Sequence, residues 1–269
     1  MLKKWGFVIV VIAVLSASCS KYQAILKSSD LDLKYEAAIK YYDDERYDRA
    51  VVLFEELIPL FRGTDRSEIV YYNYAYCNYQ LDLLYAASYH FKKFATNFPS
   101  SKHAQECLFM YAYTNYLLSP KPTLDITETK KGIEALQLFI NTYPQHALVD
   151  SSNVLMDRLR NKLEEKSYLN SKQYYKIFKY KSAIISIANT LLDFPDSKYR
   201  EELTFLTFKS HYYLAENSIK KKKLERINNS IDAYYTFVDS YKESKYLKEA
   251  QTLFTKLAKM KEEYNLKNS

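Results

Sequence analysis

Few side chains in this sequence are placed to do covalent or metal chemistry. The histidines, His90, His103, His146 and His211, include no close pair at the spacing of metal ligands. No Cys-x-x-Cys pair and no Gly-x-Ser-x-Gly elbow occurs, and 3 glycines are too few for a phosphate-binding loop. The acidic residues 43–45 are interpreted as a turn or helix end. We therefore predict no enzymatic activity, no metal and no cofactor; an active site assembled from distant residues is the alternative.

The first nineteen residues have the order of an export signal. Two lysines at residues 3–4 are followed by an apolar run over residues 7–15, three small residues and Cys19. The apolar run is too short for a stable membrane span. Its end is similar to a bacterial lipobox, although Ser16 stands where leucine is usual. We predict a signal peptide over residues 1–18 and acylation of Cys19, for example with palmitate. A simple cleaved signal with a leftover thiol is the alternative.

Lipid chains on Cys19 would anchor the protein to a membrane surface, since each buried CH2 group contributes about 0.8 kcal/mol. By resemblance to other lipoproteins, Ser20 in place of Asp favours the outer membrane. No acidic run follows that would favour the cell exterior. The expected location is the outer membrane, lipid-anchored and facing the periplasm, with residues 19–30 as the tether.

The composition favours helices that pack or bind through tyrosine. The chain has 3 glycines and 6 prolines, on which tight turns depend, and 28 tyrosines, whose rings carry a polar tip. Removing residues 1–18 takes away two lysines, so the remaining net charge is 37 − 32 = +5. This charge is too mild to indicate nucleic acid. Cys77 and Cys107 are interpreted as buried thiols, with a disulfide as the alternative in an exported protein.

One short unit recurs and defines the organisation of the chain. Its order is an apolar residue (threonine in one copy), three further residues, an aromatic residue and usually proline. Proline ends a helix because it cannot continue the backbone hydrogen-bond ladder. The copies cover residues 57–62, 94–99, 139–144, 190–195 and 237–242, the first and last with Arg and Lys in place of proline.

Small residues precede these units at a constant distance. Twelve positions before the last residue of each copy stand Ala50, Ala87, Gly132, Ala183 and Ser230. Eight positions before it stand Phe54, Phe91, Leu136, Ile187 and Tyr234. This spacing marks one face of a helix, and the small residue is where a second helix can approach closely.

A second helix pattern precedes each unit, because residues 74–79 match residues 111–116 at an offset of 37. Each repeat is therefore a pair of helices, similar to the tetratricopeptide pattern. We predict an all-α, tetratricopeptide-like α-solenoid of about five helix-pair repeats, in which stacking buries the apolar face of each unit. Repeats 1–3 are expected over residues 31–150. Repeats 4–5 are expected over residues 151–269, with one long linking helix or two helices over residues 151–180.

Two inserted segments are expected to be loops. Residues 119–131, which contain two prolines, are predicted to form a loop inside the third repeat. The lysine run at residues 220–223 is predicted to be a solvated loop of the fifth repeat, and contact with acidic lipid or an acidic partner is the alternative.

Several stretches together are similar to the BamD family, whose members are lipoprotein subunits of the bacterial β-barrel assembly machinery. They cover 46–50 with Phe54, 119–125 with Thr127 and Thr129, 159–163 with Lys166, 174–176 with Tyr180 and Ala183, and 194–197. They span most of the chain after the signal, and the Pro-x-Pro-Thr-Leu-Asp insert and the Leu-Arg-x-Lys-Leu segment are more particular than the repeat motif.

The resemblance implies a periplasmic scaffold of outer-membrane protein assembly (the Bam complex). Such a protein would bind the periplasmic domains of the barrel-forming core subunit, mainly through its C-terminal repeats. It would take extended segments of unfolded outer-membrane proteins in a groove of its N-terminal repeats, for insertion into the outer membrane. The expected partners are these proteins and the membrane, through the lipid anchor, and not nucleic acid.

The candidate residues of the peptide-binding groove lie on the first helices of the repeats. They are Tyr74, Asn78, Tyr111 and Asn115, with Tyr41 and Tyr72 as further members. An Asn amide can donate to a peptide carbonyl and accept from its N–H, and tyrosine rings suit aromatic chain ends. The alternative is that the asparagines fill polar gaps between helices and that the tyrosines belong to the core.

Two other functions fit the same repeats. An envelope adaptor lipoprotein in wall synthesis or division is one. A nutrient-capture lipoprotein beside an outer-membrane transporter is the other, but such binders carry exposed tryptophans for glycans, and the only tryptophan here is Trp5, inside the predicted signal.

Overall fold

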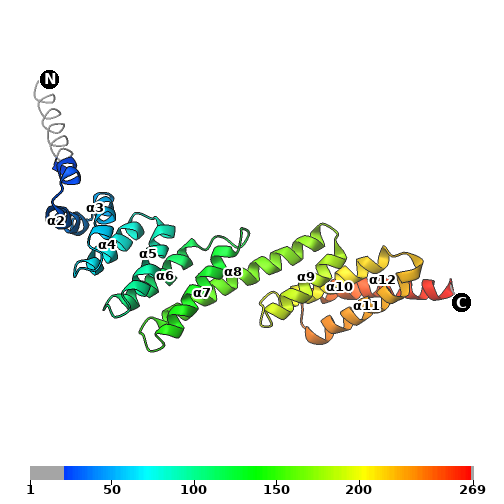
Figure 1. Ribbon diagram of the computed structural model, residues 1–269. Coiled ribbons are helices and arrows are strands. Elements are labelled where there is room, and N and C mark those ends of the chain that lie inside the picture. The colour runs from blue at the N-terminus through cyan, green and yellow to red at the C-terminus, as the bar shows by residue number, and fades with distance from the viewer. Residues whose placement is uncertain (1–20, 268–269) are drawn as a thin grey trace, which may run out of the picture. The chain divides into compact units, whose positions relative to one another are not determined.

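The computed structural model describes residues 21–267, which form helices joined by short loops with no strand among them. A helix over residues 21–27 comes first. It is followed by α2 (Leu31–Asp43), α3 (Tyr47–Leu60), α4 (Ser67–Gln80), α5 (Leu84–Asn97), α6 (Ala104–Leu118), α7 (Thr127–Thr142), α8 (Val149–Lys176), α9 (Tyr180–Asp193), α10 (Arg200–Glu216), α11 (Lys220–Ser240) and α12 (Leu247–Leu266) (Figure 1). The predicted signal peptide and Cys19 lie outside the described residues.

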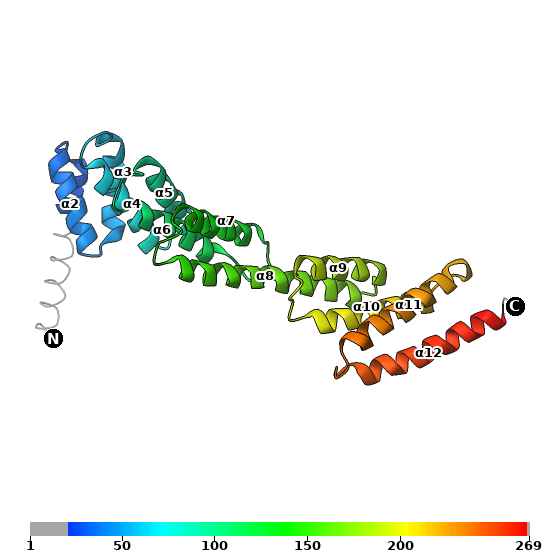
Figure 2. The ribbon, with the colours of Figure 1, turned by 90° about the horizontal axis from the view of Figure 1, so that it is seen from below.

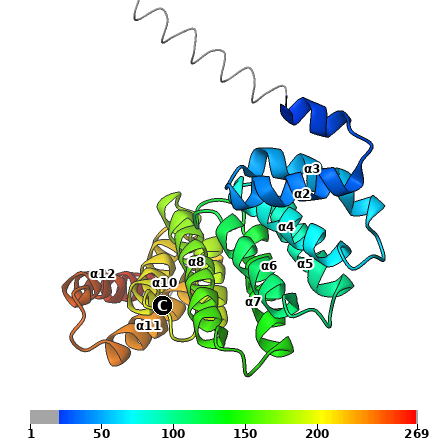
Figure 3. The same cartoon turned by 90° about the vertical axis from the view of Figure 1, so that its left-hand side faces the viewer.

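Successive helices pair into hairpins, from α2–α3 to α10–α11, and α12 follows the last pair. This confirms the predicted all-α solenoid of helix-pair repeats. The chain divides into two compact units. Unit 1 contains the residues up to Pro120 together with Ile126–Leu159, and unit 2 contains Lys121–Asp125 and the residues from Arg160 onward. Figure 3 shows the stacked hairpins α2–α3, α4–α5 and α6–α7 of unit 1, and Figure 2 shows α9 to α12 of unit 2 from below.

The small residues of the repeat lie where helices meet. Ala50, Ala87, Ala183 and Ser230 are all fully buried. At Gly132 a Cβ atom would stand 2.7 Å from Cδ1 of Leu159 and 3.2 Å from the carbonyl oxygen of Asn115. A methyl group here would have to displace Leu159 and press on the backbone of α6, so α7 packs more closely against its neighbours at this position than an alanine fits without adjustment.

The aromatic residue of each recurring unit ends a helix. It is the C-cap of α3, α5, α7, α9 and α11, as Phe61, Phe98, Tyr143, Phe194 and Tyr241. In every case its backbone N–H donates to the carbonyl four residues earlier. The recurring unit thus encodes the end of the second helix of each repeat.

A serine in three of the loops that follow these helix ends donates to a glutamate on the first helix of the same repeat. The pairs are Ser101–Glu68, Ser197–Glu164 and Ser244–Glu201, each with an O–O distance of 2.6 Å. The same serine oxygen accepts a backbone N–H two residues later in each loop. We call these contacts the serine latches, because each joins the first helix of one repeat to the loop that leads into the next.

The short turns inside three hairpins share one backbone conformation. Glu45, Asp82 and Phe178 have φ of 58°, 58° and 60°. In each turn this residue donates its N–H to the carbonyl three residues earlier, and the next residue donates to the carbonyl five residues before it. The α2–α3, α4–α5 and α8–α9 turns are therefore the same turn built from different sequences.

Two loop predictions need correction, and one open question is answered. The loop inside the third repeat ends at Ile126, since α7 begins at Thr127. The prediction that the lysines 220–223 form a loop is wrong, because they form the first turn of α11. Residues 151–176 belong to one helix, α8. Among the described residues, no helix is long and apolar enough to cross a membrane.

Candidate peptide-binding surface

The two asparagines chosen from the repeat pattern are buried inside unit 1. The side-chain N–H of Asn78 donates to the carbonyl of Tyr74 at 2.8 Å. That of Asn115 donates to the carbonyl of Tyr111 at 2.7 Å and to Oγ of Ser88 at 2.6 Å. Their exposed fractions are 3% and 5%. Both amides therefore satisfy polar groups between and within helices, and little of either can touch a ligand without rearrangement.

The four tyrosines of the prediction differ in exposure. Tyr74 is buried, with its ring edge-on to His90 at 4.7 Å between centroids. Tyr41, Tyr72 and Tyr111 are half-buried, and a cation covers the first and last of these rings: Arg46 lies 5.1 Å from the ring centre of Tyr41, and Lys92 lies 5.1 Å from that of Tyr111. Tyr72 lies in a separate cluster of polar and aromatic side chains.

That cluster joins α4 to α6 around one carboxylate. The Tyr72 hydroxyl donates to both oxygens of Glu106 at 3.1 Å, and the Tyr76 hydroxyl also donates to Glu106. The ring of His103 lies 4.3 Å from that of Tyr72. Burial, together with the negative charge of Glu106, raises the pKa of both tyrosines. They consequently stay protonated donors, and a half-exposed carboxylate is fixed between two first helices.

A row of rings continues from Glu106 along α6. Phe109 and Tyr113 are stacked with centroids 6.0 Å apart, and Tyr113 and Tyr116 are stacked 6.1 Å apart. All three rings are half-buried. We call the half-buried rings of α4 (Tyr72, Tyr76 and Tyr79) and of α6 (Phe109, Tyr113 and Tyr116), with Glu106, the tyrosine face.

The tyrosine face combines the two kinds of contact that an extended peptide needs. Ring faces and edges can pack against aromatic or aliphatic side chains of a ligand, and the carboxylate and phenolic oxygens can accept its backbone N–H groups. The sequence pattern contained most of these residues, since Tyr76 and Tyr79 match Tyr113 and Tyr116. Successive residues of an α-helix point about 100° apart, so Tyr76 and Tyr79 point in other directions than the buried Asn78. This angular difference is the sequence signal that would have identified them.

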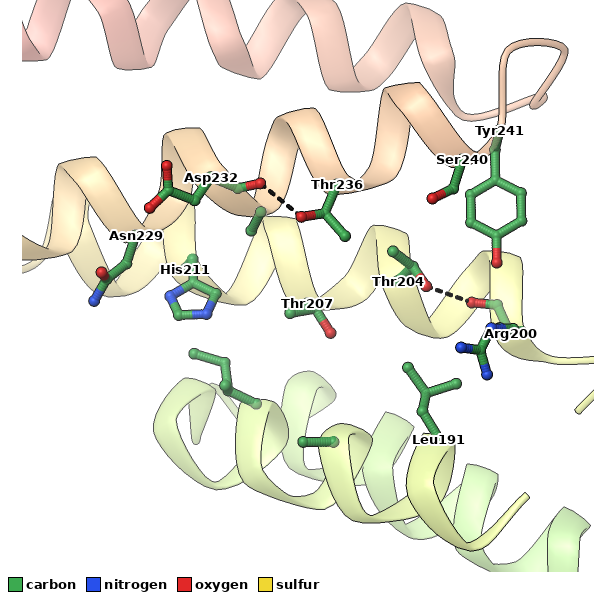
Figure 4. A pocket seen from close by; sticks show the side chains of 13 residues that line it. Leu191, Arg200, Thr204, Thr207, His211, Asn229, Asp232, Thr236, Ser240 and Tyr241 are labelled. Carbon is green, nitrogen blue, oxygen red and sulfur yellow. Dashed lines mark hydrogen bonds between the residues drawn. The ribbon is translucent and has the colours of Figure 1, made fainter. Parts of the chain in front are cut away.

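A second region lies in unit 2, where α9, α10 and α11 enclose a groove of about 470 Å³. Figure 4 shows Arg200 at one end of this groove and His211 with Asp232 at the other. Its walls include five small side chains, with Ile184, Leu191 and Tyr241 as larger members; the small ones are Ala188, Thr204, Thr207, Ala233 and Thr236. The three threonine hydroxyls donate to carbonyls of their own helices. Their methyl groups therefore contribute to the surface of the groove between the charged side chains at its two ends.

The remaining reactive groups are held in unreactive forms. Cys77 and Cys107 are free, fully buried thiols in different clusters of the core, and burial raises the pKa of Cys77 to about 12 and also raises that of Cys107. Burial lowers the pKa of His211, against the opposing effect of Asp232. Within residues 21–267, no group of three or more His, Cys, Asp or Glu side chains could hold a metal ion.

The hairpins and their capped ends define an all-α protein built of helix-pair repeats. The model of the YfiO family, described as an outer membrane lipoprotein family, matches residues 28–227. This covers most of the chain, including nine complete helices from α2 to α10, so the chain belongs to that outer membrane lipoprotein family.

No curated protein matches the chain. Two solved structures of helical-repeat proteins are similar at 13% identity. The TPR2AB domain of yeast Sti1, in a complex with pHSP90, has a TM-score of 0.38 and a match that covers 87% of this chain and 92% of that one. A putative kinesin light chain of Podospora anserina with nearly identical TPR-like repeats has a TM-score of 0.32, with 89% and 97% covered.

Proposed function

We propose that the protein is a non-enzymatic scaffold of outer-membrane β-barrel assembly, with its lipid on Cys19 and its repeats in the periplasm. In this function unit 1 binds extended segments of unfolded outer-membrane proteins, and unit 2 binds the periplasmic domains of the barrel-forming core subunit. The tyrosine face is the observation that carries the proposal. Membership in an outer membrane lipoprotein family supports it.

The proposed peptide contacts are the half-buried rings. Tyr72 is the member that belongs to the tyrosine face, and Tyr41 and Tyr111 extend the contact along neighbouring surfaces. Tyr74, Asn78 and Asn115 would support these rings from below. A membrane β-strand alternates apolar and polar side chains. An extended segment of this kind could set its apolar side chains against the rings and its backbone N–H groups toward Glu106.

The groove between α9, α10 and α11 supports the second half of the proposal. Its apolar and threonine side chains offer a surface for the side chains of a partner, and its charged ends, Arg200 and Asp232, can orient that partner by electrostatic complementarity. A fold that presents such a groove in one unit and the tyrosine face in the other can hold two different proteins.

The first test is a pull-down from detergent-solubilised envelopes through a C-terminal tag, read by mass spectrometry. Recovery of the barrel-forming subunit in near-stoichiometric amount is expected. Its absence, with wall enzymes or a transporter recovered instead, would show that the repeats serve an envelope adaptor or nutrient capture.

The second test examines the tyrosine face. The unsubstituted protein and its Tyr113→Ala variant are each titrated into a fluorescent peptide from the last strand of an outer-membrane barrel. Fluorescence anisotropy gives the Kd of the peptide for each protein. Loss of one ring contact weakens binding about 3- to 10-fold, as expected for roughly 0.5–1.5 kcal/mol of aromatic contact. The matched control is Tyr85→Ala on α5, whose side chain is 65% exposed and lies outside the tyrosine face. Equal weakening in both variants would remove the tyrosine face from the proposal.

A further inference from the structure

The α8–α9 turn of unit 2 exposes large apolar side chains. Phe178 is 75% exposed and the preceding Ile177 is 46% exposed. The one ring beside Phe178 among the described residues is Tyr180, edge-on at 6.3 Å between centroids. The neighbouring lysines at 176, 179 and 181 are exposed as well. We call the five residues 176–179 and 181 the first tip. Its composition, large apolar side chains alternating with cations, is that of a segment at a membrane–water interface.

The turn itself does not require phenylalanine. Phe178 has φ of 60°, a left-handed conformation that is unfavourable for bulky residues. The same turn with the same hydrogen bonds is built around Glu45 and Asp82 in unit 1. The left-handed backbone at a bulky residue thus costs folding free energy, the exposed ring recovers little of it by burial, and neither feature serves the turn. The ring is therefore explained by something that it contacts outside the fold.

The connection inside the next hairpin of unit 2 also exposes an apolar residue beside cations, although its backbone conformation differs. Ile219, 69% exposed, stands directly before the four lysines 220–223, of which the first three are exposed. We call residues 219–222 the second tip. Cations at the start of a helix are opposed by the helix dipole, and α11 has no acidic residue in its first turn. The lysines are unfavourable for the helix that holds them, as Phe178 is for its turn.

The two tips lie on the same side of unit 2. Tyr180, directly after the first tip's Lys179, stacks on Tyr213 of α10 with ring centroids 5.2 Å apart, and Tyr213 lies in the last turn of α10, just before the second tip. Figure 1 and Figure 2 show the α8–α9 and α10–α11 turns at the same side of their hairpins, with the α9–α10 loop on the opposite side.

The sequence around the first tip carries charge of one sign over a long stretch. Between Glu165 and Asp193 the chain has five lysines and no acidic residue. Around the second tip the nearest acids in sequence are Glu216 and Glu225, and Glu216 accepts a hydrogen bond from Tyr212 at 3.0 Å. Glu263 of α12 lines the same pocket as Lys220 and Lys223, and the lysines of the two tips outnumber it. Exposed cations beside exposed apolar side chains complement a surface that is anionic outside and apolar a few ångströms deeper, which is the headgroup region of an anionic bilayer.

We propose that the two tips form a membrane-contact site that inserts Phe178, Ile177 and Ile219 among anionic phospholipids, with the lysines at the phosphate level. The site is separate from the lipid at Cys19 and from the barrel-assembly function, so a protein that binds no barrel segment would keep it. Such a contact would hold unit 2 against the bilayer by its turns.

The test uses the mature lipoprotein, in which removal of the predicted signal peptide with Trp5 leaves the chain without tryptophan. In this background Phe178→Trp places one fluorophore at the first tip. The matched control is Asp82→Trp, which puts the same fluorophore in the same backbone turn of unit 1. Both proteins are reconstituted into phosphatidylglycerol or phosphatidylcholine vesicles, with or without brominated acyl chains as quenchers.

We expect the Phe178→Trp protein to shift its emission to shorter wavelengths and to lose most of that emission to brominated phosphatidylglycerol. The indole of the Asp82→Trp protein should remain in water, and the effect in the Phe178→Trp protein should weaken in phosphatidylcholine and at high salt. Equal quenching of both proteins, or of neither, overturns the proposal. If the Phe178→Trp indole is exposed in vesicles but shielded in native envelopes, the first tip contacts a protein, and the lipid assignment is wrong.

Discussion

Asp82 in unit 1 and Phe178 in unit 2 occupy the same place in the same turn, yet their side chains have opposite chemistry. Their φ values are 58° and 60°, and the hydrogen bonds correspond one to one. Packing of the two helices therefore determines this backbone, and the side chain at its tip is free to vary without loss of the fold. Where packing imposes no requirement, a costly residue such as an exposed phenylalanine points to a contact outside the chain.

The contrast extends to the neighbouring turns. In unit 1 the α2–α3 turn has the acidic run 43–45 and the α4–α5 turn has Asp82, whereas the turns of unit 2 carry the lysines of the two tips. An anionic surface would repel the acidic turns of unit 1 and attract the basic turns of unit 2. The two units thus present different turns to their surroundings, although both are built from the same repeat.

The largest effect is expected from a test of whether the two units unfold separately, in which one buried aromatic ring is removed from each unit in a separate variant. Phe139 and Phe237 are fully buried in different clusters, and truncation of either to alanine should cost about 3–5 kcal/mol. We expect hydrogen exchange to accelerate in α6–α7 for Phe139→Ala and in α10–α11 for Phe237→Ala. Equal acceleration across both units in either variant would show that the whole chain unfolds as one.

Acid should loosen unit 1 at the α4–α5 hairpin. Burial, helped by Lys93, lowers the pKa of His90 from 6.5 to about 4, so the unfolded chain binds a proton between these values and the folded chain does not. The stability due to neutral His90 is complete above pH 6.5 and falls as the pH drops toward 4, by at most about 3 kcal/mol. Denaturant unfolding at about pH 7 and about pH 4.5 measures the loss across this window. His90→Gln should reduce the pH dependence of the free energy of unfolding. If that pH dependence is unchanged, the loss of stability comes from other groups.

The strain at Phe178 predicts a variant that gains stability. Phe178→Gly removes a left-handed side-chain conflict worth about 1–2 kcal/mol, partly offset by glycine's greater freedom in the unfolded chain, for a net gain of about 1 kcal/mol. Thermal unfolding should show a higher Tm. Phe178→Ala keeps the Cβ atom and is the control, expected near the wild-type Tm. A lower Tm for the glycine variant would mean that the ring packs within the fold.

The smallest effect is expected at a buried hydroxyl of α11. Among the described residues, Ser230 Oγ is buried without a hydrogen-bond partner, while three other repeats have alanine at this position. Ser230→Ala should raise stability by on the order of 0.5 kcal/mol. Ser244→Ala, which breaks a serine latch, should lower it. Urea unfolding gives the free energy of unfolding of both variants, and a change in the same direction for both would contradict this prediction.

The sequence could predict what every repeat shares. The small residues at Ala50, Ala87, Gly132, Ala183 and Ser230 were recognised as close approaches, and the aromatic units were recognised as helix ends. These positions are determined by packing between neighbouring helices, so the same requirement recurs and becomes visible as a period. Repetition therefore predicts the fold.

The repeat period does not distinguish the buried residues of a first helix from its half-exposed residues. Tyr74 and Asn78 recur as regularly as Tyr76 and Tyr79, but the first two are buried and the others are half-exposed. The lysines 220–223 could not be placed either, because four cations at a helix start contradict the usual signals. Packing of Ile227, Ser230 and Tyr234, all buried further along α11, outweighs that local preference.

The stacking of repeats, each of which contacts only its neighbours, also affects how each unit would respond to force. A pull on the stack would pass from one junction between repeats to the next, as through springs in series, with the serine latches among the contacts that hold the loops at these junctions. The total extension is then the sum of the junction extensions, and the softest junction yields first. A protein tethered at one end that holds a chain under tension would thus lengthen gradually, one junction at a time, without exposing its buried rings together.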